Sequence, residues 1–210
     1  MKQLLKQYAA YYGTVGIVLL TGSIILLFCS KEAVQLWVDA NHLAYLDVFF
    51  SYLTHLGDGL TFVTVILFMA LWRSYYLAFE GLLSFATSGL FTQLLKRTVF
   101  ADVLRPKGLL GAQLHYIAGV EVHTTHSFPS GHATTAFALA TFLVLHSTPK
   151  NGILWALAAA LVGFSRIYLN QHFLPDVLAG ALIGTAWATA MHQLLLPLQQ
   201  KDAWQRHLLP

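Results

Sequence analysis

The sequence predicts an all-α protein: a bundle of six transmembrane helices with an amphipathic interfacial helix between the first and the second. Three observations predict it. Only 10% of the 210 residues are charged, 57% are hydrophobic, and mean hydropathy is +0.62. A soluble domain carries roughly a quarter charged residues, so this chain could not cover a globular surface with charge. Six apolar runs approach the ~20 residues that cross a bilayer, and the length suits one domain over residues 1–210.

The first apolar run covers residues 7–30 and contains GTVGIVLLTGSIILLFC. Two lysines precede it, so a signal peptide is an alternative. The length of the run and the lack of an A-x-A site favour an uncleaved membrane anchor. Residues 31–57 mix aromatic and charged side chains, which predicts an amphipathic helix along the outer interface, with an ordinary loop as the alternative.

Five further runs complete the predicted bundle. The second is short, but Arg73 at its end can extend to the lipid headgroups. Glu80 interrupts the third, and small residues in the last suit close helix packing in lipid. The runs are residues 59–72, 75–95, 133–146, 152–165 and 176–197.

Charge and cysteine content exclude several classes of protein. The net charge of +3 comes from 12 basic and 9 acidic residues that are scattered along the chain, so no nucleic-acid partner is expected. The single cysteine, Cys29, excludes an internal disulfide and any cysteine-based metal cluster.

Unusual polar residues gather in two connections, residues 96–132 and 166–176, which six crossings place on the same face of the membrane. The tetrapeptide Pro129-Ser130-Gly131-His132 stands where a helix begins. Free backbone N–H groups at such an end bind anions, and Gly131 lets a ligand approach the backbone. A plain helix cap would explain this segment equally well.

The second connection carries Arg166, His172 and Asp176. A charge at the end of an apolar helix needs a partner, and a guanidinium binds phosphate bidentately. A carboxylate one helical turn from an imidazole would fix its tautomer and leave the other nitrogen nucleophilic. Lys96 and Arg105 add two cations to the same face. Taken together, these groups suit phosphoryl transfer.

The sequence resembles the type 2 phosphatidic acid phosphatase superfamily, whose pattern is K-x6-R-P, then P-S-G-H, then S-R-x5-H-x3-D. The second block is intact at residues 129–132 and the third at residues 165–176. The first departs, because eight residues rather than six separate Lys96 from Arg105. Either Lys96 keeps the role with an insertion, or Arg97 takes it. The motif region covers residues 96–176.

The resemblance implies a role for each matched residue. His172 would attack phosphorus and form a phosphohistidine, and Asp176 would orient it. His132 would protonate the leaving group and then activate water. The phosphoryl oxygens would be held by Lys96, Arg105, Arg166 and the Ser130 and Gly131 backbone, with help from the Ser130 hydroxyl.

The resemblance implies no metal or other cofactor. His123, His126 and His132 form a histidine-rich stretch that could bind zinc, but no cysteine and only Glu121 as a carboxylate accompany them. We expect His123 and His126 at the rim of the site, and His115 has no assigned role.

The expected function is hydrolysis of a lipid phosphate monoester or diphosphate in the membrane. Phosphatidylglycerol phosphate, phosphatidic acid, prenyl diphosphates and lipid A phosphates all remain open. The alternatives are a lipid-to-lipid phosphotransferase and a non-catalytic anion-binding membrane protein. The oligomeric state is not predicted.

Basic residues give a preferred orientation. With the N-terminus inside, the inner and outer segments carry six basic residues each. Three of the outer residues, Lys96, Arg105 and Arg166, have a chemical role and are set aside. Six basic residues then lie in the inner segments and three in the outer ones, which favours both termini inside. The compact length suggests a bacterial cytoplasmic membrane, with the active site facing the periplasm or exterior.

Overall fold

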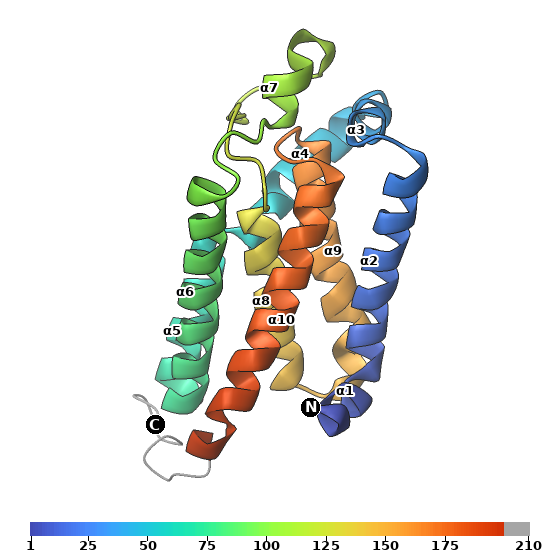
Figure 1. The fold of residues 1–210 in the computed structure, drawn as a ribbon. Coiled ribbons are helices and arrows are strands. Elements are labelled where there is room, and N and C mark those ends of the chain that lie inside the picture. The colour runs from blue at the N-terminus through green and yellow to red at the C-terminus, as the bar shows by residue number, and fades with distance from the viewer. Residues whose placement is uncertain (200–210) are drawn as a thin grey trace.

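A computed structural model describes residues 1–199 as a bundle of helices, and no strand occurs in that range (Figure 1). The long helices run along one common direction, and several short helices gather at one end of the bundle. Residues 99–130 form a long connection at that end. The elements are α1 Lys2–Gln7, α2 Ala9–Phe28, α3 Lys31–Asp39, α4 Ala44–Leu53, η1 Thr54–Gly57, α5 Gly59–Trp72, α6 Tyr75–Thr98, α7 Pro106–Leu110, η2 Gly111–Gln113, α8 Gly131–Leu145, η3 Pro149–Asn151, α9 Gly152–Tyr168 and α10 Leu174–Gln199.

The all-α prediction is confirmed over the described residues, and each of the six apolar runs coincides with a helix. By length and composition, α2, α9 with the turn before it, and α10 could each cross a membrane. The segment from α4 to α5 could form a fourth span, although it bends by 51° at its break. α8 has only 15 residues, and α6 is long but more polar. Six crossings therefore stay a prediction.

The prediction of one amphipathic helix over residues 31–57 is not confirmed, because the helix is interrupted. The segment forms two helices, α3 and α4, and one turn of 3-10 helix. Ser30 caps the start of α3, and the Asn41 side chain donates to the Trp37 carbonyl where α3 ends. Leu43 then adopts extended backbone, which starts α4 in a new direction.

The polar face of α6 explains its low hydropathy. Glu80, Ser84, Ser88, Thr92 and Lys96 recur every four residues and are all buried. This spacing places them on one side of a helix. The side faces α8 and α10, where the Thr92 hydroxyl donates to that of Thr134, and Glu80 contacts a histidine of α10.

α8 and α10 form the centre of the bundle and approach each other closely at glycines (Figure 1). A Cβ atom on Gly180 would lie only 2.6 Å from the Ser130 carbonyl oxygen. This close packing brings the start of α8 beside the start of α10. The N-terminus and the end of α10 lie at the opposite end of the bundle.

Candidate active site

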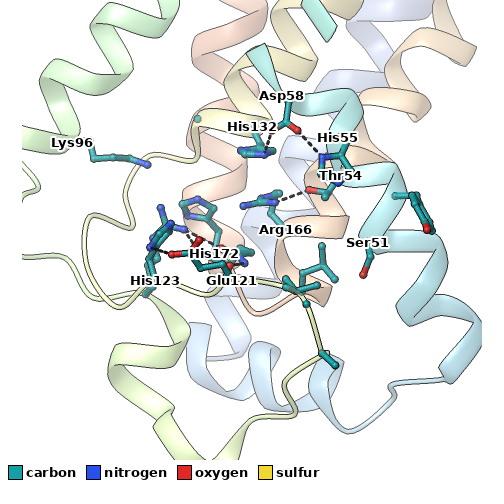
Figure 2. Close-up of a pocket in the computed structure, with 18 of the residues that line it drawn as sticks. Ser51, Thr54, His55, Asp58, Lys96, Glu121, His123, His132, Arg166 and His172 are labelled. Carbon is teal, nitrogen blue, oxygen red and sulfur yellow. Dashed lines mark hydrogen bonds and ion pairs between the residues drawn. The ribbon is translucent and has the colours of Figure 1, made fainter. Parts of the chain in front are cut away.

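A polar cavity of about 540 Å³ opens where α6, α8 and α9 meet the connections before α8 and α10. Figure 2 shows side chains from several helices converging on it. Ser130 and Asp176 are buried directly behind this lining. Six of the eight sequence-predicted site residues line the cavity: Lys96, Arg105, Gly131, His132, Arg166 and His172.

His172 and Asp176 form the most buried polar pair of the site. The His172 side chain precedes α10, and Asp176 lies in the first turn of that helix. Nδ1 of His172 is 3.3 Å from Oδ2 of Asp176, and the residues are 1% and 3% exposed. Because Asp176 engages Nδ1, the other ring nitrogen, Nε2, is free to face the cavity.

Two further donors fix the Asp176 carboxylate. Its Oδ2 accepts hydrogen bonds from the Ser127 hydroxyl at 2.5 Å and from the Phe173 backbone N–H at 3.0 Å. A carboxylate with this many donors on one oxygen has a single orientation. The imidazole of His172 is therefore held from behind by a fixed acceptor.

Three cations are buried around the pair. Arg105 donates through Nε to the Thr125 carbonyl oxygen and through Nη1 to Gln171. Arg166 donates through Nη1 to the Thr54 hydroxyl at 2.6 Å. Nε of Arg166 is buried and makes no hydrogen bond within residues 1–199, which leaves a donor for a ligand.

The third cation is Lys96 rather than Arg97. Lys96 is only 7% exposed and lines the cavity together with Arg105 and His172. Arg97, one position further along α6, is exposed and lines only a neighbouring surface pocket. Consecutive helical residues point about 100° apart, so only one of the two can face the cavity.

Burial and charge keep His172 neutral. Desolvation lowers the pKa of His172 well below its ordinary value, and the positive charges of Arg105, Arg166 and Lys96 lower it further. Burial likewise lowers the pKa of Arg105. A neutral imidazole carries a lone pair on the nitrogen that is not protonated, so His172 has the form that a nucleophile requires.

His132 has a carboxylate partner that the sequence did not indicate. Nε2 of His132 lies 2.7 Å from Oδ1 of Asp58, the residue that precedes α5 (Figure 2). The other oxygen of Asp58 lies 2.7 Å from Nδ1 of His55. The site thus contains two histidine–aspartate pairs, one behind His172 and one behind His132.

Ser130 differs from the sequence-based expectation. Its backbone N–H is not free, because it donates to the Asp176 carbonyl oxygen at 2.9 Å. Its hydroxyl accepts from the Ala133 N–H at 3.4 Å and thereby caps α8. Ser130 is fully buried, so it joins the starts of α8 and α10, whereas Gly131 lines the cavity.

Sequence reasoning missed four polar residues that contact the predicted site. Asp58 and Thr54 come from the bent segment before α5. Thr54 falls within residues 31–57, where the sequence predicted an interfacial helix, and Asp58 directly follows that range. Ser127 lies two residues before the second motif block, and Gln171 occupies a variable position inside the third; that proximity was the one signal available. None of the four contacts follows from spacing, because each joins segments distant in the chain.

The histidine-rich stretch does not gather at one point. His132 pairs with Asp58, while Nδ1 of His123 lies 3.8 Å from Glu121 at the rim. His126 contacts the Thr125 hydroxyl and lines the neighbouring pocket. Within residues 1–199, two other groups bring possible metal-binding atoms within 4.8 Å of one another: His42, Asp47 and His115, and Glu80, His146 and His192.

The fold and the cavity define an α-helical integral membrane protein with a buried, cation-lined pocket that holds a histidine–aspartate pair. The chain belongs to the PAP2 superfamily, whose family model matches residues 77–199. The match includes all three sequence blocks and the helices that carry them.

Curated relatives share its motif region. The chain is 32% identical to phosphatidylglycerophosphatase B of Bacillus subtilis over 146 residues, 63% of this chain and 66% of the relative. It is 42% identical to an undecaprenyl-diphosphatase of Sulfolobus acidocaldarius over 62 residues, 30% of each chain. The matched segments span about a third or less of the first curated relatives.

A solved structure shares the fold over most of the chain. It is the crystal structure of a transmembrane PAP2-type phosphatidylglycerolphosphate phosphatase from Bacillus subtilis. The TM-score is 0.63 at 25% identity, covering 93% of this chain and 98% of that one.

Proposed function

We propose that this chain is a membrane phosphatase that hydrolyses a lipid phosphate monoester or diphosphate through a phosphohistidine intermediate. The observation that carries the proposal is a buried His172 that Asp176 holds from behind and that three cations surround. The names of the matched relatives agree with this chemistry. Three cations against the carboxylates of Asp176 and Asp58 leave the pocket suited to a phosphate anion.

In the first step, Nε2 of His172 attacks phosphorus and the bond to the leaving oxygen breaks. Asp176 accepts a hydrogen bond from the Nδ1 N–H and stabilises the positive charge that forms on the ring. Lys96, Arg105 and Arg166 hold the phosphoryl oxygens, and Nε of Arg166 is an unused donor for this purpose. The Gly131 backbone lies at the cavity wall, where an oxygen can approach it closely.

His132 acts as the general acid in the first step and as the general base in the second. Asp58 engages Nε2 of His132 and stabilises the doubly protonated ring. Nδ1 of that imidazolium gives its proton to the leaving oxygen, which leaves His132 neutral for the next step. In the second step, Nδ1 takes a proton from water. The water oxygen bonds to phosphorus, the N–P bond breaks, and phosphate leaves. His132 and His172 return to their starting forms.

The two alternatives fit less well. A protein that only binds anions needs cations, but it has no need for a nucleophile with a fixed carboxylate behind it. A phosphotransferase would use the same first step and a lipid hydroxyl in place of water. Phosphate release in the absence of an acceptor lipid separates it from a hydrolase.

The function is tested by phosphate release from the detergent-purified protein. The panel contains phosphatidylglycerol phosphate, phosphatidic acid, a prenyl diphosphate and lipid A. We expect turnover of at least one member and none in the His172→Ala protein. No release from any lipid phosphate by well-folded wild type would contradict the proposal.

We further propose that the cavity faces the outside of a bacterial cytoplasmic membrane, with both termini inside. Cys29 is exposed and directly follows α2, which ends beside α3 at the cavity end of the bundle (Figure 1). The exposed Lys150 belongs to η3, the turn that joins α8 to α9 at the end where the N-terminus lies. In intact cells, a membrane-impermeant maleimide should label native Cys29. It should label the Cys29→Ser, Lys150→Cys protein only after permeabilisation. The reverse pattern would invert the orientation.

The Asp58 contact gives a quantitative prediction. In the Asp58→Asn protein we expect kcat to fall about 10- to 100-fold with little change in KM, because His132 loses its charged partner. Asparagine is as good a residue before a helix as aspartate, so the thermal midpoint should hold. The control is Asp102→Asn, an exposed loop acid. An unchanged kcat would remove Asp58 from the mechanism.

A further inference from the structure

A second cluster of ionisable side chains lies inside the bundle, far from the cavity. Nε2 of His146, at the end of α8, lies 2.8 Å from Oε1 of Glu80 on α6. Nδ1 of His192 on α10 lies 3.1 Å from the same oxygen. All three possible ligand atoms fall within 4.8 Å of one another.

The carboxylate in this cluster lacks a full set of partners. Glu80 is 1% exposed, and its Oε2 is buried without a hydrogen bond of good geometry within residues 1–199. The neutral hydroxyl of Tyr76 interacts with this carboxylate but brings no charge. Over the same residues, its ion pairs are with His146 and His192, and none is with lysine or arginine. A buried carboxylate needs a compensating charge. A proton on one imidazole or a bound cation can supply it here, and a proton on the carboxyl group itself would remove the need for it.

We propose that Glu80, His146 and His192 bind one divalent transition-metal ion, with zinc as the best match. Two imidazole nitrogens and one carboxylate oxygen form a ligand set that zinc accepts at three of its four positions. Magnesium and calcium prefer sites made entirely of oxygen. Tyr76 is buried beside the group, its ring 6.2 Å from that of His146, and water could occupy the remaining position.

An ion can reach the cluster from the end of the bundle where the N-terminus lies. A cavity of about 370 Å³ opens there and is lined by His192, Tyr8, Leu145 and Gln193. His192 is therefore both a member of the cluster and part of the cavity wall.

The position indicates a structural role for the ion. Glu80 and Lys96 are 16 residues apart on α6, about 24 Å at 1.5 Å per residue, so the ion cannot touch a substrate in the catalytic cavity. Yet α6, α8 and α10 are the helices that present Lys96, His132 and Asp176 at their other ends. One ion bound by all three helices would fix their mutual alignment.

The test measures metal binding and needs no turnover, so its outcome is independent of the proposed catalysis. Protein made without a histidine tag is stripped with chelator, saturated with ZnCl₂, desalted and analysed for bound zinc. Glu80→Gln and His192→Gln should each retain one equivalent less than wild type. Cobalt should give wild type a visible absorption band that both variants lack. Zinc should raise the thermal midpoint of wild type by about 5 °C.

The matched control is His115→Gln, which removes a ligand from the other cluster of His42, Asp47 and His115. This variant should keep the zinc equivalent, the cobalt band and the thermal shift. Wild type without bound zinc would overturn the proposal and leave a carboxylate paired with a protonated imidazole. If His115→Gln lost the zinc equivalent and Glu80→Gln kept it, the ion would bind at the cluster of His42, Asp47 and His115, and the proposal would be overturned too. If Glu80→Gln does not fold, the wild-type stoichiometry, His115→Gln and His146→Gln decide.

Discussion

Replacing His172 with alanine should reduce phosphate release at least about a thousandfold, because the proposed covalent intermediate forms on its imidazole. His172 is 1% exposed and lines the cavity together with three cations, and Asp176 engages its Nδ1 rather than its Nε2. The readout is kcat on the best lipid of the panel. His172→Asn, which leaves a smaller hole, should show the same loss.

A trapping experiment distinguishes loss of the nucleophile from loss of structure. Rapid quenching of wild type with labelled substrate should yield protein-bound phosphate that is stable in alkali and labile in acid, as expected for phosphohistidine. His172→Ala should yield none, yet should bind vanadate and melt near the wild-type temperature. The matched control is His126→Ala in the exposed loop, which should still form the adduct. Turnover of His172→Ala within tenfold of wild type would refute the assignment.

Much of the fold and of the site could be predicted from local patterns. Apolar runs predicted where each helix of the bundle lies, since burial in lipid demands long uncharged stretches. The motif blocks lie at helix ends, and the count of membrane crossings puts these ends on the same face. Lys96 and His172 were therefore expected on one face, and the structure places both at a single cavity.

The rest depends on contacts between distant segments. In the sequence, Asp58 is an acidic residue before a helix with no visible partner. It contacts His132 because α5 packs beside α8. Glu80 appeared as an interruption of an apolar run because its partners, His146 and His192, lie on other helices. Sequence spacing predicts neighbours within one helix, whereas these pairs depend on how helices pack.

The second large effect is expected for Asp176→Asn, with kcat falling about 10²- to 10⁴-fold and KM changing little. The carboxylate accepts from Nδ1 of His172, from the Phe173 N–H and from Ser127. An amide can still accept at its oxygen, but its NH₂ group can donate to Nδ1. That donation stabilises the tautomer with the proton on Nε2, the nitrogen that must attack. The protein would then hold His172 in place in its unreactive form.

Ser127→Ala provides the matched comparison, because it removes one donor to the same carboxylate oxygen and leaves the negative charge intact. We expect kcat to fall no more than about tenfold, since the Phe173 N–H still fixes the carboxylate. Both variants keep the backbone bond from Ser130 to the Asp176 carbonyl, so both should fold. If Asp176→Asn and Ser127→Ala lose activity equally, the carboxylate acts only by positioning, and its charge has no part in activating His172.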